Sequence, residues 1–147
     1  MAMKRILWPT DLSGRSQRAL PYVKSLSDKY QTEVHVLYVM EDLAHHEGWY
    51  GNFEQTHIDR IMDWEKRKAR QRLNRICTSQ LEGCPRYVKH TSVGDPAGEI
   101  VKLIEREKVD AVVMATRGET EHVHDDCVTE WVAKNSPVPV KKIRMAA

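Results

Sequence analysis

The fold is indicated first by residues 109–118, which have the sequence Val-Asp-Ala-Val-Val-Met-Ala-Thr-Arg-Gly. We predict a strand over residues 110–116, because its apolar residues run on without the alternation of a half-exposed strand. A strand that is apolar on both faces suits a sheet covered by helices on both sides, and we predict that this one is central. A polar loop is predicted from Arg117 to about Asp125. A short helix should follow, carrying Val128, Trp131 and Val132.

Four further strands are predicted, and helical patterns separate them. The strands comprise residues 6–8, 33–40, 86–93 and a last edge strand after Pro137-Val138-Pro139-Val140. Apolar residues at helical spacing predict helices over residues 13–30, over 58–81 and from Pro96 onwards. Pro21 lies inside the first helix, where it should cause a bend or a late start. Residues 41–57 contain two glycines and no clear period, which predicts a loop.

This alternation of strands and helices fits one domain over residues 1–147. It predicts an α/β fold, with a doubly wound parallel sheet, right-handed crossovers and helices on both faces. In such sheets ligands bind at the carboxyl ends of the strands, where the strand order reverses. We therefore look for a site among four loops, at residues 9–13, 39–42, 93–96 and 116–127.

Composition excludes several classes of function. Hydrophobic residues make up 41% and charged residues 30%, which is typical of a globular protein and not of a disordered one. No apolar run approaches the ~20 residues of a membrane span, and no signal peptide is seen, so we expect a cytoplasmic protein without a membrane partner. The three cysteines, of which none forms a CxxC pair, are expected as reduced thiols. A net charge of +2 gives no sign of nucleic-acid binding, and the basic run at residues 65–75 is interpreted as the solvated face of a helix.

Several segments, taken in order, resemble the universal stress protein family. They are residues 5–13 (RILWPTDLS), 33–39 (EVHVLYV), 94–97 (GDPA), 109–118 and 137–140 (PVPV). The likeness covers essentially the whole chain apart from residues 41–57. It implies a Rossmann-like, five-stranded parallel sheet, a homodimer joined through the last strand, and a role in stress tolerance. Some members bind ATP or a related adenine nucleotide, and others do not.

The phosphate loop departs from the pattern of the nucleotide-binding members. They carry Gly-x-x-Gly, nine residues and then Gly-Ser or Gly-Thr, whereas here Ala115 takes the first position, Gly118 keeps the second, and seven residues lead to Asp126-Cys127. Glu119, Glu121, Asp125 and Asp126 also crowd the loop. Two unit charges 4 Å apart interact by ~4 kcal/mol at a dielectric of 20, more than the ~0.3–1 kcal/mol that a helix N-terminus usually offers an anion. We expect ATP binding to be impaired or lost.

The adenosine half of the pocket matches the family better. The resemblance places Asp11 where a carboxylate meets the nucleoside, and Val39 where the second-strand backbone meets the adenine edge. Without the family, Asp11 is better interpreted as a turn aspartate and Val39 as a core valine, and the resemblance makes the nucleotide-binding roles about as good an interpretation. The full set of candidate nucleotide-binding residues is Pro9, Thr10, Asp11, Val39, Ala115, Arg117, Gly118, Cys127 and Val128.

A metal site is a separate hypothesis for the same loop. His122, His124 and Cys127 are ligand types for Zn²⁺, and a His-x-His pair projects to one side only if its backbone is extended. In a helix, residues two apart diverge and cannot chelate. The alternative is a solvated loop with Asp125 and Asp126 capping the following helix.

Three functions follow from these observations. The first is a non-enzymatic, homodimeric stress-response protein that acts through a protein partner or as a folding or redox aid. The second is a switch that binds adenosine, AMP or ATP. The third, weak ATP hydrolysis, needs phosphate ligands that the chain does not supply, and no nucleophile–base pair or triad stands at a recognisable spacing. A phosphoryl-receiver domain would need an aspartate at the end of the third strand, which instead ends in Thr91-Ser92-Val93-Gly94.

Overall fold

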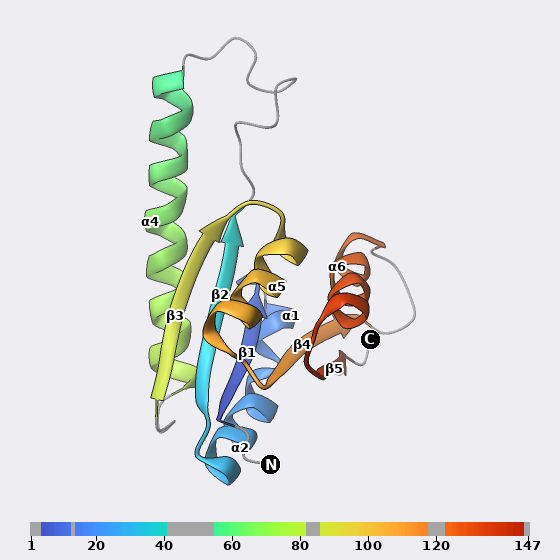
Figure 1. The fold of residues 1–147 in the computed structure, drawn as a ribbon. Coiled ribbons are helices and arrows are strands. Elements are labelled where there is room, and N and C mark those ends of the chain that lie inside the picture. Colours follow the sequence, from blue (N-terminus) through green and yellow to red (C-terminus); the bar gives the residue numbers. More distant parts are fainter. Residues whose placement is uncertain (1–3, 13, 41–54, 82–85, 118–122, 146–147) are drawn as a thin grey trace.

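The computed structural model describes residues 4–12, 14–40, 55–81, 86–117 and 123–145 (Figure 1). The strands in these ranges are β1 (Arg5–Thr10), β2 (Glu33–Met40), β3 (Arg86–Val93), β4 (Ala111–Arg117) and β5 (Val140–Met145). The helices are α1 (Gly14–Gln17), α2 (Leu20–Tyr30), α4 (Gln55–Gln80), α5 (Pro96–Glu107) and α6 (Val123–Asn135).

The strands form one parallel sheet in the order β3-β2-β1-β4-β5, which confirms the predicted α/β fold. β1 is the central strand, with Trp8 opposite Val36 of β2 and Ile6 opposite Ala111 of β4. The prediction that the strand of residues 110–116 is central is therefore wrong. An apolar sequence indicates that both faces of a strand are covered, and this holds for every internal strand of such a sheet. It therefore cannot tell which internal strand is the central one. β5 lies at the edge of this sheet, as predicted.

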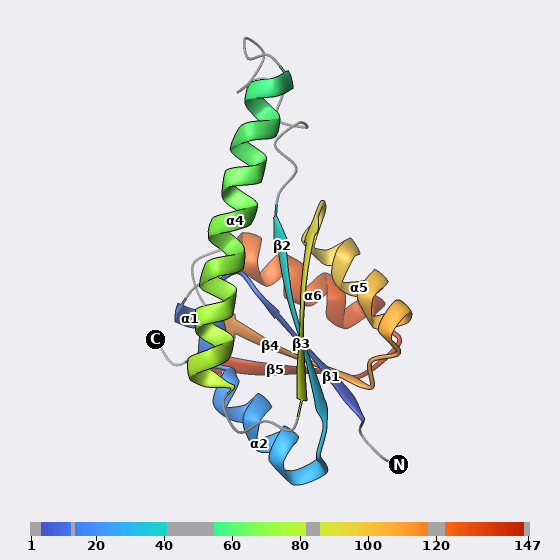
Figure 2. The same cartoon turned by 90° about the vertical axis from the view of Figure 1, so that its left-hand side faces the viewer.

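Helices cover both faces of the sheet, so the core has two parts (Figure 2). On one face α2 and α4 pack against side chains of β1, β2 and β4, and the fully buried members of this cluster include Ile6, Trp8, Val23, Val34, Val36, Cys77, Leu81 and Val113. On the other face α5 and α6 pack against Leu7, Leu37 and Val112. Successive residues of a strand point to opposite faces, and this is why the continuous apolar runs of β1 and β2 serve both clusters.

The bend or late start predicted from Pro21 is confirmed. The segment 13–30 forms two helices, and Pro21 lies in the first turn of α2, where its missing N–H costs no helical hydrogen bond. Ala19 precedes α2 without a side-chain cap. Ser16, which lies in α1, hydrogen bonds to Thr10.

α4 extends beyond the carboxyl ends of the strands (Figure 1). Its packed part carries Ala69, Leu73 and Cys77, which are all buried, whereas the Trp64 side chain is 48% exposed with Lys68 Nζ 4.0 Å from its ring centre. The amino-terminal half of α4 mixes charged residues with apolar ones such as Ile61 and Met62. Among the described residues, no helix combines the length and the apolar character needed to cross a bilayer.

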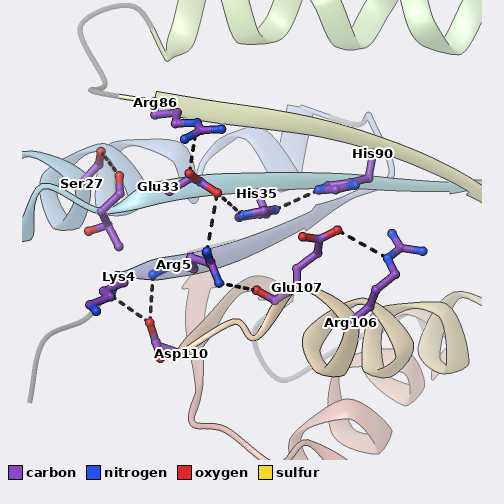
Figure 3. A network of polar contacts seen from close by, with 11 residues as sticks. Lys4, Arg5, Ser27, Glu33, His35, Arg86, His90, Arg106, Glu107 and Asp110 are labelled. Carbon is purple, nitrogen blue, oxygen red and sulfur yellow. Dashed lines mark hydrogen bonds and ion pairs between the residues drawn. The ribbon is translucent and has the colours of Figure 1, made fainter.

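A network of polar contacts links β1, β2 and β3 near the amino-terminal ends of these strands (Figure 3). Glu33 lies at its centre, with Oε1 2.7 Å from His35 Nε2 and Oε2 3.1 Å from Arg86 Nε. His35 Nδ1 lies 2.9 Å from His90 Nε2, and the two rings stack with an interplanar angle of 12°. His35 is only 2% exposed. Its contacts with Glu33 and His90 therefore supply the hydrogen bonds that water would otherwise make to this imidazole.

The proton positions in this network follow from the carboxylate. An ionised Glu33 can only accept, so His35 Nε2 donates to it, and the Nδ1 atom of a neutral His35 must accept from His90 Nε2. Burial, and after it the charge that His35 can carry, lower the pKa of His90 below its ordinary 6.5. Glu107 and Glu33 oppose this shift, and Arg106 adds to it.

Candidate functional site

The turn after β1 is closed by hydrogen bonds between its own side chains and backbone. Thr10 Oγ1 and Ser16 Oγ share a hydrogen bond of 2.6 Å, and the Leu12 amide donates to Thr10 Oγ1 over 2.9 Å. The indole N–H of Trp8 donates to the Ser16 carbonyl at 3.1 Å. Leu12 adopts a left-handed conformation with φ of 68°, which costs a residue other than glycine roughly 1–2 kcal/mol. The turn is thus strained at Leu12 and held by its neighbours.

The connection from β3 to α5 faces the same end of the sheet and depends on a glycine. Gly94 has φ of 146°, and a Cβ there would lie 3.0 Å from Glu99 Oε1. The Gly94 amide donates to the Met40 carbonyl at 2.9 Å, which joins the ends of β2 and β3. Asp95 accepts from the Gly98 amide at 2.9 Å and caps α5, with Pro96 in the first turn. The helix predicted from Pro96 onwards is therefore confirmed.

A pocket of about 130 Å³ opens at the carboxyl ends of β1, β2 and β4, next to the first residues of α5. From β1 the chain adds β2 and β3 on one side and then β4 and β5 on the other, so the strand order reverses between β1 and β4. The pocket lies at this position, where ligands bind in sheets of this kind. Most of its wall is apolar, and the polar side chains that reach it are Thr10, Asp11, Ser16 and Thr129. An apolar cleft with a few convergent polar groups is typical of a small-molecule site.

Six of the nine candidate nucleotide-binding residues line this pocket. They are Pro9, Thr10, Asp11, Val39, Ala115 and Val128. Arg117 is the last residue of β4, and Cys127 belongs to α6, but the side chains of both lie outside the described part of the structure. Gly118 lies outside the described residues altogether.

Sequence reasoning missed the other half of the lining, which consists of Ser16, Leu37, Pro96, Ile100, Met114 and Thr129. Leu37 could have been found by alternation, because it shares a strand face with Val39 two residues on. Pro96 lies in one of the four loops that we selected. Ile100 and Met114 line the pocket and are also buried members of the core on this face of the sheet.

The proposed metal ligands lie in a segment that is described only in part. His122 lies outside the described residues, and the side chains of His124 and Cys127 do as well. The helix α6 begins at Val123, earlier than predicted, so His124 has a helical backbone and Asp125 and Asp126 fall in the first turn. Elsewhere in the described residues, no group of three or more potential metal ligands comes together.

Comparison with known proteins agrees with this geometry. Residues 3–142 match the model of the universal stress protein family, and the chain belongs to this family. The universal stress protein MJ0531 of Methanocaldococcus jannaschii is 28% identical, over 96% of this chain and 82% of its own. The solved structure of MJ0577, from the same organism, superposes with a TM-score of 0.82 at 26% identity, covering 100% of this chain and 99% of the other.

Two more distant structures share the fold and contain an adenine nucleotide. One is a universal stress protein in complex with cAMP, with a TM-score of 0.64 at 18% identity over 99% of this chain and 100% of the other. The second is the universal stress protein of Archaeoglobus fulgidus in complex with dAMP, with a TM-score of 0.66 at 17% identity over 97% and 99%.

Proposed function

We propose that this chain is a non-enzymatic stress-response protein whose pocket takes the adenosine part of an adenine nucleotide, with ATP binding impaired. The main support is that Pro9, Thr10, Asp11, Val39, Ala115 and Val128, chosen from the sequence as a nucleotide site, surround one pocket. An apolar wall suits the faces of a purine, and the Asp11 carboxylate suits the hydroxyl groups of a ribose. Two proteins with this fold have been solved in complex with cAMP and dAMP, which are adenine nucleotides like the ligand proposed for this pocket.

The phosphate end of the ligand is where binding should fall short. Asp125 and Asp126 belong to the first turn of α6, and negative charge in that part of the sequence disfavours an anion at the start of the helix. Glu119 and Glu121 precede them in the sequence. The pocket volume of about 130 Å³ is also below the ~300–1,000 Å³ of sites that enclose a drug-sized ligand. Adenosine and AMP should therefore bind better than ATP.

Calorimetric titration of adenosine, AMP and ATP tests this order, each with and without Mg²⁺. Asp11→Asn should weaken AMP binding about tenfold, because a hydrogen bond to a charged group is replaced by a weaker neutral one. Asp28→Asn is the matched control, since it makes the same change of charge on α2, away from the pocket. It should leave AMP affinity unchanged.

Other outcomes would change the proposal. If ATP binds more tightly than AMP, the acidic loop does not repel phosphate, and the chain is an ATP-binding switch. If none of the three ligands binds, the pocket is not a nucleotide site, and the function must lie in a protein partner.

A redox role has little support from Cys77, because burial raises the pKa of this thiol to about 11 and keeps it protonated at neutral pH.

We also propose that the protein is a cytoplasmic homodimer joined through β5. This strand pairs with β4 on one side only within the described sheet, and an open strand edge favours pairing with another chain. Two copies of β5 would meet antiparallel across a two-fold axis. Light scattering at micromolar concentration should give twice the chain mass of 17.0 kDa, and a monomer would contradict the proposal.

A further inference from the structure

The turn that carries Asp11 is also held from a distant element. Arg72 lies within α4, and its Nη2 atom donates to the carbonyl oxygen of Leu12 over 2.9 Å. The two residues are 60 positions apart in the sequence. Ala69 and Leu73, which flank Arg72 on the helix, are 5% and 1% exposed, so this part of α4 is fixed to the sheet. The hydrogen bond therefore links the β1–α1 turn to a rigid support.

Leu12 is held at both its backbone amide and its backbone carbonyl. Its amide donates to Thr10 Oγ1, its carbonyl accepts from Arg72, and its φ of 68° is one that leucine rarely adopts. Strained backbone of this kind persists only where the surroundings hold it. Asp11, which lines the pocket, lies directly between Thr10 and Leu12. The direction of the Asp11 side chain thus depends on the anchors at both of its neighbours.

We propose that Arg72 is a positioning residue for the ligand pocket, which fixes Leu12 and thereby the direction in which Asp11 faces the pocket. The proposal rests on the proposed nucleotide site and extends it to a residue on the opposite face of the sheet. Arginine suits this role because its guanidinium is planar, permanently charged and rich in N–H donors. Arg70 differs from Arg72 in direction, because residues two apart on a helix lie about 200° apart around its axis.

Arg72→Met tests the proposal, with Arg70→Met as the matched control. Both variants remove one positive charge from α4 and keep a long side chain, but only the first removes the donor to Leu12. We expect Arg72→Met to weaken AMP binding about threefold to tenfold, as for the loss of one hydrogen bond. Arg70→Met should bind AMP like the wild type. Arg72→Lys keeps a charged donor and should recover part of the affinity.

A second measurement reports on the turn without any ligand. Hydrogen exchange at the Leu12 amide, followed by NMR, should become faster in Arg72→Met and stay unchanged in Arg70→Met. The Val36 amide in β2 serves as the reference for global opening, so a rise confined to Leu12 shows that the turn itself has loosened. Mere loss of stability would raise exchange at both amides.

The two measurements separate the possible failures. Equal losses of AMP affinity in Arg72→Met and Arg70→Met would assign the effect to charge and overturn the positioning role. If the wild type binds no adenine nucleotide, the proposed function fails, and the exchange experiment alone decides whether Arg72 holds the turn. An unchanged exchange rate at Leu12 in Arg72→Met would then overturn the inference.

Discussion

Trp8→Ala is expected to lower the free energy of unfolding by about 3–5 kcal/mol, the largest effect of any single change considered for this protein. The Trp8 side chain is fully buried in the central strand, so the surrounding core cannot collapse into the space that its removal leaves. Its indole N–H also donates to the Ser16 carbonyl, which accepts from the Ala19 amide as well, so the lost hydrogen bond adds only about 0.5–1.5 kcal/mol. Chemical denaturation, followed by circular dichroism, measures the change.

Trp131→Ala is the matched control, because its side chain is 45% exposed on α6. It should change the stability by no more than about 1 kcal/mol. Since whole domains are stable by only about 5–15 kcal/mol, Trp8→Ala could leave too little folded protein to measure. Trp8→Phe then serves in its place, with an expected loss of about 0.5–1.5 kcal/mol from the missing N–H donor. Equal losses for Trp8→Ala and Trp131→Ala would contradict the packing described here.

Acidification from pH 7 to pH 5 is expected to destabilise the protein through His90. Burial lowers the pKa of His90 in the folded chain below its ordinary 6.5, so the unfolded chain takes up this proton first. The contribution of His90 to stability is therefore complete above pH 6.5 and declines as the pH falls from there towards the folded pKa. The slope from one proton is at most about 1.4 kcal/mol per pH unit.

His90→Leu provides the comparison, because it removes the titrating group and leaves an apolar side chain at the position that pairs with Leu37 of β2. The free energy of unfolding is measured by urea denaturation at intervals between pH 7.5 and pH 5. The slope in this window should be smaller in the variant than in the wild type. The same slope in both proteins would show that other groups cause the acid sensitivity. Glu33, Glu107, Arg106 and His35 are the neighbours whose charges act on His90.

Much of the fold could be predicted, because its signals are local. The strands at residues 33–40 and 86–93 have the predicted bounds, and the Gly-Asp-Pro triplet begins α5 as expected. The strand order could not be predicted from apolar character alone, since β1 and β4 both carry a run of at least three buried apolar residues. The start of α6 was placed too late, because two consecutive aspartates suit a loop and a first helical turn equally well.

The candidate site could be predicted to the extent that it lies on strand ends. Asp11 and Val39 are visible there, but the role of Ser16 depends on a contact with Thr10 that only the closed turn creates. Arg72 is harder still to find. In the sequence it is one of six basic residues between positions 65 and 75, and nothing in their spacing shows which one meets the Leu12 carbonyl.

The central place of β1 has a consequence for synthesis on the ribosome. β1 is made first and can pair with β2 as soon as that strand emerges, whereas its other partner, β4, comes about one hundred residues later, as in the contact of Lys4 with Asp110 across 106 positions. Until then one edge of this central strand stays open. Such delayed pairing slows folding and exposes a nascent chain to aggregation. A protein associated with stress would thus pass through its most vulnerable state before its own C-terminal half is complete.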